Sequence, residues 1–174
     1  MKTKTETILI VMNVLTWIAF VGLMIEAGAV LVSWFVSLVN EEAAKNLYMR
    51  FDLSSLKQSS VWLYSISLFF KFGLLSLKAL AAYLVIEILW KLNIINPFTV
   101  EISRRIEKMS YVVLSAGILA LVSDGYHNWL NHRGFNFPQG PDPGEFLFLA
   151  GILFIVAQTF KKGVELQSEN ELTI

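Results

Sequence analysis

The stretch that decides the fold is residues 8–39, ILIVMNVLTWIAFVGLMIEAGAVLVSWFVSLV. It is apolar apart from Asn13, Thr16, Glu26 and two serines. It is also longer than the roughly 20 residues that a helix needs to cross the hydrocarbon core of a bilayer. We therefore expect a tilted or projecting transmembrane helix. Because the run is too long for a signal-peptide core and continues past the small residues 27–29, we expect an uncleaved anchor.

Three further apolar runs follow this one. Residues 61–92 and 109–130 are each long enough to cross. Residues 145–162 reach the required length only if the acidic side chain at their start and the two lysines at their end lie at the membrane interfaces. These runs predict an all-α protein, an integral membrane four-helix bundle that forms one domain over residues 1–174.

Lysine and arginine residues outside the four runs predict the orientation. On the side of the N-terminus there are eight: Lys2, Lys4, Lys91, Arg104, Arg105, Lys108, Lys161 and Lys162. On the opposite side there are four: Lys45, Arg50, Lys57 and Arg133. Because cytoplasmic loops carry the excess of basic residues, we expect a multi-pass protein of the cell inner membrane with both termini, and the tail 163–174, in the cytoplasm.

Composition and motifs exclude several functions. The chain has no cysteine, so it has no disulfide, thiolate metal site or thiol nucleophile. The 14 basic and 14 acidic side chains give zero net charge without a basic stripe, which argues against direct nucleic-acid binding. The sequence contains no glycine-rich phosphate loop, nucleophile elbow or zinc-protease motif. We expect a protein that is not an enzyme and holds no cofactor.

Four charged residues interrupt the apolar runs: Glu26, Lys71, Lys78 and Asp124. A charge at bilayer depth costs about 2.5 to 3.5 kcal/mol, so each should have a partner. A rise of ~1.5 Å per residue places all four in one layer, in the outer half of the membrane. Lys71 and Lys78 are seven apart and share a helix face, so two acids from neighbouring helices would neutralise them. We expect an intramembrane charge network that fixes packing; a proton or ion relay, or an anionic-ligand site opening outward, is the alternative.

A metal site near the outer surface is a weaker alternative. Asp124, His127 and His132 offer a carboxylate and two imidazoles, which are ligands that zinc accepts. Their spacing does not place them on one helical face unless the helix ends between them. We therefore predict no metal site.

The loop between the second and third runs, NIINPFTVEISRRIEKMS (93–110), contains a helix start. Pro97 lacks the amide hydrogen that a first turn leaves unpaired, and either Asn96 or Thr99 can cap the helix. Apolar side chains then recur at helical spacing with basic ones around them, as in a helix that rests on the membrane surface or enters the third run. A basic loop beside anionic lipid is the simpler interpretation. The alternative is that this loop forms half of a docking surface.

The chain ends in an acidic segment, KKGVELQSENELTI (161–174). The spacing of Lys161, Glu165 and Glu169 predicts that the last helix continues for two turns, with Lys161 and Glu165 paired, unless Gly163 interrupts it. Carboxylates beside apolar side chains suit a basic, groove-bearing partner such as a DNA-binding domain. A solvated end, or one that folds back on the loop arginines, is the alternative.

Two patterns in the second half resemble a known family. They are Asn96-Pro97-Phe98-Thr99-x-Glu101 with Arg105-Ile106, and Phe160-Lys161-x-Gly163-x-Glu165-Leu166-Gln167-x-Glu169-Asn170 followed by Leu172-Thr173-Ile174. The chain resembles the small bacterial four-helix membrane proteins known as domain of unknown function family 2975, in helix pattern over essentially its whole length. Glu171 departs from the aspartate expected there. The resemblance implies no enzymatic activity and a gene beside a small helix-turn-helix regulator of the Cro/repressor type.

These patterns together predict a membrane protein that holds or releases a cytoplasmic transcription regulator. The expected docking residues are Asn96, Pro97, Phe98, Arg104, Arg105, Glu165, Glu169, Glu171, Leu172 and Ile174. The expected partners are the lipid bilayer and this DNA-binding regulator, with no nucleic acid bound directly and a homo-oligomer left open. The alternative function is a small transporter or immunity-type protein that works through the intramembrane charge layer.

Overall fold

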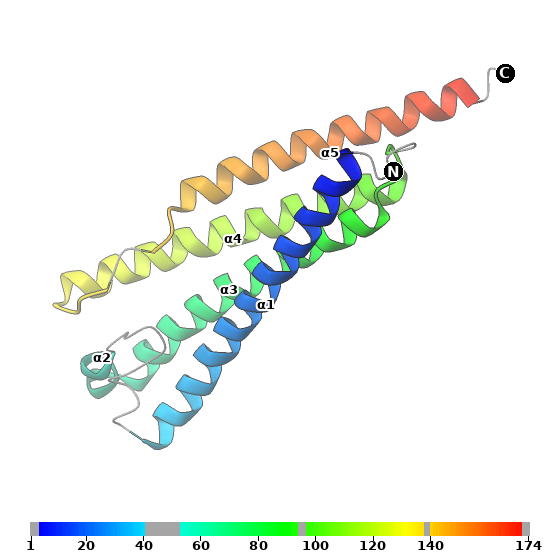
Figure 1. The fold of residues 1–174 in the computed structure, drawn as a ribbon. Coiled ribbons are helices and arrows are strands. Elements are labelled where there is room, and N and C mark those ends of the chain that lie inside the picture. Colours follow the sequence, from blue (N-terminus) through cyan, green and yellow to red (C-terminus); the bar gives the residue numbers. More distant parts are fainter. Residues whose placement is uncertain (1–3, 41–52, 94–96, 138–139, 172–174) are drawn as a thin grey trace.

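The computed structural model describes residues 4–40, 53–93, 97–137 and 140–171, with side chains as far as Glu169. Figure 1 shows its five helices, which are α1 (Lys4–Val39), α2 (Ser54–Ser59), α3 (Val61–Lys91), α4 (Val100–His132) and α5 (Pro143–Glu171). No strand occurs within the described ranges, so the all-α prediction is confirmed.

The four long helices, α1, α3, α4 and α5, are each long and apolar enough to cross a membrane. Large apolar side chains point away from the protein along them: Ile18 on α1 is 65% exposed, Leu121 on α4 58% and Phe148 on α5 73%. Continuous apolar surface of this kind is rare on soluble proteins and marks a surface that meets lipid or another protein. Helix length, composition and outward surface all support a multi-pass membrane protein.

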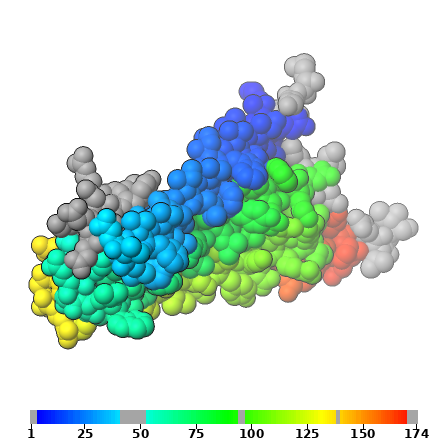
Figure 2. Space-filling model, turned by 90° about the horizontal axis from the view of Figure 1, so that it is seen from below, coloured from blue at the N-terminus to red at the C-terminus, as the bar shows by residue number. Residues whose placement is uncertain are grey.

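The long helices pack side by side in chain order, α1 on α3, α3 on α4 and α4 on α5. Among the described residues, no Cα atom of α1 lies within 8 Å of a Cα atom of α4 or α5. Figure 2 shows α1 lying along the outside of the molecule, with its first turns standing away from the rest. The bundle is therefore an open row of helices.

The two ends of the row differ in the elements that meet there. The first turns of α1, the start of α4 and the end of α5 lie at one end, which we call the junction end (Figure 1). The short helix α2 and the end of α4 lie at the other, which we call the α2 end.

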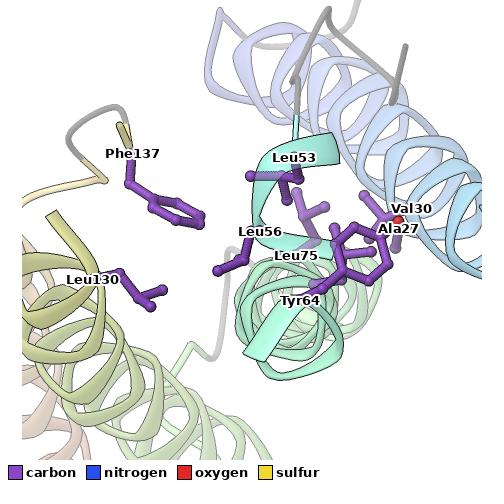
Figure 3. Packing of buried hydrophobic residues seen from close by; sticks show 9 residues of the cluster. Ala27, Val30, Leu53, Leu56, Tyr64, Leu75, Leu130 and Phe137 are labelled. Carbon is purple, nitrogen blue, oxygen red and sulfur yellow. The ribbon is translucent and has the colours of Figure 1, made fainter. Parts of the chain in front are cut away.

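The larger hydrophobic cluster lies at the α2 end (Figure 3). Leu56 of α2 and Tyr64 of α3 are fully buried in it, beside Ala27 and Val30 of α1. Leu130 and Phe137, from the end of α4 and the segment that follows it, belong to the same cluster. This packing joins α1, α2, α3 and α4 at one end of the molecule.

Polar contacts to Ser37 reinforce the α2 end. The Tyr64 hydroxyl donates a hydrogen bond to Ser37 Oγ over 2.7 Å, and the Lys57 ammonium donates to the Ser37 carbonyl. The second contact satisfies a carbonyl in the last turn of α1, where no intrahelical donor remains. Helix α2 was not predicted from the sequence, and most of the connection before it, residues 41–52, lies outside the described residues.

Small residues line the contact between α4 and α5. Ser103, Ser110 and Gly117 lie seven apart on one face of α4. The two serine hydroxyls donate to the carbonyls of Ala157 (3.3 Å) and Ala150 (3.1 Å), and a Cβ at Gly117 would lie 2.9 Å from a side-chain atom of α5. Small side chains let two helix backbones approach closely. We call this contact the small-residue seam.

Helix α4 is longer than the third predicted run, 109–130. It begins at Val100 because the Thr99 hydroxyl accepts a hydrogen bond from the Ile102 amide over 3.3 Å, which is the geometry of an N-cap. The helix predicted in the loop and the third run are therefore one continuous helix. The helix predicted in the loop continues directly into the part of α4 that can cross the membrane, and it does not form a separate surface helix.

Candidate functional site

Charged side chains at the junction end join α3 to α4. Arg105 forms ion pairs with Glu87 of α3 and with Glu101, one turn earlier in α4, at 3.0 Å. Lys91, at the end of α3, also pairs with Glu101. The side chains of Arg105 and Glu87 are only 19% and 25% exposed, so both charges have lost much of their hydration. The attraction between them compensates for part of that loss. We call these four residues the α3–α4 clamp.

The loop that enters α4 packs against α5 through Phe98. Its ring lies over Gly163, where an added Cβ would come within 2.5 Å of the ring Cδ1. The ring also contacts Phe160, with 5.2 Å between the two centroids. A side chain at position 163 would occupy the space of the ring, so glycine permits this close approach. The two sequence patterns that carry the family resemblance therefore touch each other.

Beside this contact, an open groove of about 330 Å³ lies between the start of α4 and the end of α5. It is lined by Val100, Ser103, Arg104, Glu107, Lys161, Val164 and Glu165. The lining residues recur every three or four positions on each helix, so each helix contributes one face. Two cations, two carboxylates and two valines can bind a polypeptide by charge and by apolar contact together. We call it the junction groove.

The tail after the apolar part of α5 is helical. The helix continues through Gly163 to Glu171, and Glu165, Leu166 and Glu169 are exposed on it. The sequence predicted that Glu165 pairs with Lys161, whereas the structure pairs it with Lys162 at 2.8 Å. On a helix surface, a side chain can contact a partner three positions away as well as one four positions away. The Lys161 side chain lines the groove.

The structure separates the predicted docking residues into two groups. Arg104 and Glu165 line the junction groove, and Pro97 precedes the packed ring of Phe98. Arg105 is held by the α3–α4 clamp and does not line the groove, because two carboxylates occupy its guanidinium. The described residues do not include Asn96, Leu172, Ile174 or the side chain of Glu171.

Several groove residues were not predicted from the sequence. These are Val100, then Ser103 three positions later and Glu107 four positions after that, so their spacing already indicated a common helix face. Nothing in the sequence indicated that the end of α5 lies against this face. Without that neighbour, the face is indistinguishable from the side of any charged helix.

The structure does not join the predicted charge network. Lys78 lies over the Phe146 ring of α5, 5.4 Å from its centroid, and Asp124 accepts a hydrogen bond from Asn128 Nδ2 over 3.1 Å. Between described side chains, no ion pair involves Glu26, Lys78 or Asp124, so the two predicted acid–lysine pairs do not form. The helix order does not explain this, because α3, which carries both lysines, packs against α1 and against α4.

Lys71, the fourth charged residue, lines a chamber between α3 and α4 near the α2 end, together with His127. The weaker metal alternative also involved His127. His132 instead contacts the Asn128 carbonyl through Nδ1 at 2.8 Å. Within the described ranges, no three histidine or acidic side chains come together to hold a metal ion.

Comparisons with known proteins found no matching family model, no matching curated protein and no matching solved structure. The resemblance to family 2975 therefore stays a prediction.

Replacing Gly163 by leucine is expected to loosen the start of α4. The new side chain would displace the Phe98 ring, at an overpacking cost of about 1 to 3 kcal/mol. Hydrogen exchange of the amides just after Thr99 should become roughly tenfold faster, since 1.4 kcal/mol is a factor of ten. Gly151→Leu is the control, because nothing lies within 4 Å of a Cβ at Gly151 on the same helix. Equal exchange rates in the two variants would show that Phe98 does not secure this end.

Proposed function

We propose that the protein crosses the cell inner membrane four times and holds a cytoplasmic DNA-binding regulator at the junction end. The observation that carries this proposal is the junction groove, which continues into the exposed acidic helix of the tail. The regulator would occupy the groove and contact the tail. While it is held there, it is kept away from DNA.

The distribution of basic residues supports this orientation. Lys4, Lys91, Arg104 and Lys161 all belong to the segments that meet at the junction end. An excess of basic residues marks the cytoplasmic side of a membrane protein. An even number of crossings brings the beginning of α1 and the end of α5 to that same side.

The chemistry of the surface supports a basic partner. Glu165 and Glu169 are exposed on the tail, and Glu107 adds a third carboxylate in the groove. DNA-binding domains carry clustered lysine and arginine, which these carboxylates would attract and orient. Leu166 and Val100, 52% and 58% exposed, supply the apolar contacts that a stable interface also needs.

The contacts around the groove suggest how binding could be released. The α3–α4 clamp fixes the start of α4, and the contact between Phe98 and Gly163 fixes the end of α5 against the same segment. A shift of α4 relative to α3 would therefore move one wall of the groove. A regulator bound across both walls would lose part of its contact surface.

Co-purification tests the proposed function. The full chain, solubilised in detergent, should retain the product of the adjacent gene, which is expected to be a small helix-turn-helix protein. Deletion of residues 165–174 should abolish this recovery, and Glu165→Gln with Glu169→Gln should weaken binding about tenfold, because two charge contacts are lost. Glu145→Gln is the matched control, since Glu145 is also exposed but lies in the first turn of α5, at the opposite end.

Two results would contradict the proposal. One is equal recovery of the regulator by the intact chain and by the chain without residues 165–174. The other is labelling of a cysteine placed at position 174 by a membrane-impermeant maleimide in intact cells. The natural chain has no cysteine, so a single introduced thiol gives an unambiguous signal.

A further inference from the structure

The two walls of the junction groove have a fixed register. Ser103 of α4 donates a hydrogen bond to the Ala157 carbonyl of α5. Ser110, seven positions later on α4, donates to the carbonyl of Ala150, seven positions earlier on α5. The two helices are therefore antiparallel and keep the same register over this contact. Counting from these hydrogen bonds gives the order of the groove residues along the helix axes.

The charged groove residues follow one another in the order carboxylate, cation, cation, carboxylate. Glu107 lies nearest the middle of α4, and Arg104 is three positions closer to the junction end. Lys161 of α5 lies about five positions beyond Arg104, and Glu165 follows one turn later. With a rise of ~1.5 Å per residue, the whole row is about 18 Å long.

Three of these four charges have no ionic partner. Among the described side chains, no ion pair involves Glu107, Arg104 or Lys161. Glu107 and Arg104 are three positions apart, a spacing at which opposite charges on a helix can pair, yet they do not. Glu165 differs because it contacts Lys162, although an exposed pair of this kind contributes little. A partner that contacts the first three charges would therefore displace no existing ion pair.

The spacing of the row matches one face of an α-helix. Measured from Glu107, the other three charges lie about 3, 8 and 12 positions further along the groove. Residues at about 4, 7 and 11 positions from a first residue share one face of a helix. Each of these four positions on a bound helix would therefore lie within about one residue rise of a groove charge.

We infer that the junction groove binds an amphipathic helix of the regulator, one face of which carries a cation, two carboxylates and a second cation in that order. Their spacings are about four, three and four residues. The first cation contacts Glu107, the two carboxylates contact Arg104 and Lys161, and the last cation approaches Glu165. This inference rests on the proposed function, because the regulator supplies the helix.

The two central carboxylates indicate which part of the regulator is bound. DNA phosphates would repel them, whereas helices that read DNA carry lysine and arginine toward the phosphates. The bound helix is therefore a different one from the helix that enters the DNA groove. Val100 and Val164 lie on opposite walls, so they can pack against apolar side chains on both sides of the charged face.

Two isomeric alanine-based peptide helices test the inference. One carries lysine at its first and twelfth positions and glutamate at its fifth and eighth, and the other exchanges the lysines and glutamates. Both carry leucine at the ninth and eleventh positions, so their composition and net charge are identical. Fluorescence anisotropy of each labelled peptide with the full chain in non-ionic detergent measures binding. The first peptide should bind saturably and at least about tenfold more tightly, because three attractive contacts become repulsive in the second.

Reversing the charges of the groove should reverse this preference. The triple variant Arg104→Glu, Glu107→Lys and Lys161→Glu should bind the second peptide more tightly than the first. Lys108→Glu is the matched control, since Lys108 is exposed next to Glu107 but does not line the groove. It should prefer the first peptide as the unmodified chain does.

Three outcomes would overturn the inference: no saturable binding of either peptide, equal affinity for both, or a folded triple variant that still prefers the first. The comparison of the two isomers uses only the unmodified chain, so it decides the matter even if the triple variant fails to fold. Recovery of the regulator without discrimination between the peptides would contradict the helix inference alone. Failure to recover the regulator with the intact chain would contradict the proposed function.

Discussion

Replacing Gly117 by leucine is expected to separate α5 from α4 and to lower the free energy of unfolding by about 3 kcal/mol. A Cβ alone at this position would lie 2.9 Å from Leu147 Cδ2 and 3.2 Å from Phe146 Cβ. The leucine branches would extend further into the small-residue seam. The hydrogen bonds from Ser103 and Ser110 to α5 require the close approach that the leucine prevents. Unfolding in detergent by SDS titration, followed by circular dichroism, measures the loss.

Gly125→Leu is the matched control for this variant. Nothing lies within 4 Å of a Cβ at Gly125, two turns further along α4. Leucine favours a helix over glycine by about 0.5 to 1 kcal/mol, so this variant should be as stable as the unmodified chain or slightly more stable. If Gly117→Leu and Gly125→Leu unfold at the same SDS concentration, α4 and α5 are not held by the seam.

Replacing Arg105 by methionine is expected to lower the free energy of unfolding by about 2 kcal/mol, because the variant leaves Glu87 partly buried without its cation. Arg104→Met should change it by less than about 0.5 kcal/mol, since Arg104 is exposed. Recovery of the regulator should change in both variants, because Arg104 lines the junction groove and Arg105 belongs to the clamp that fixes one wall of it. The same SDS titration and co-purification measure both effects.

A double substitution tests the origin of the loss in Arg105→Met. Adding Glu87→Gln removes the unpaired carboxylate, so Arg105→Met with Glu87→Gln should be more stable than the sum of the single changes predicts. Strict additivity, or an equal loss of stability in Arg104→Met, would show that the α3–α4 clamp does not hold these helices together.

The sequence predicted the long helices well because each is a long apolar run, and such a run has few alternatives to a helix. It did not predict α2, since Ser54–Ser59 is short and polar, and the burial of Leu56 and the contact of Lys57 with Ser37 stabilise it through neighbouring elements. It began the third run at Met109 and left open whether the charged residues before it form a helix on the membrane surface or one that enters this run. The Thr99 cap and the α3–α4 clamp keep these residues in the same helix as the run.

The candidate site could be predicted only in part, because residue types were visible and neighbours were not. Arg104 and Arg105 are adjacent and chemically identical, yet one faces the junction groove and the other faces α3. The charge network was inferred from equal depth along each helix. Helices α1 and α4 both pack on α3, which carries the lysines, but equal depth does not decide which way each charged side chain faces around its helix. The direction in which each helix face is turned toward its neighbours, which decides both cases, is a tertiary property.

The open row of helices also bears on how the protein is made. Each long helix packs its backbone on the long helix synthesised immediately before it, so no such backbone packing has to wait for a helix that comes later than the next one. Assembly can follow translation pair by pair, with short loops to close at each step. A ribosome-bound intermediate that ends after α3 would already contain its complete contact with α1, and the addition of α5 would require no rearrangement of that pair.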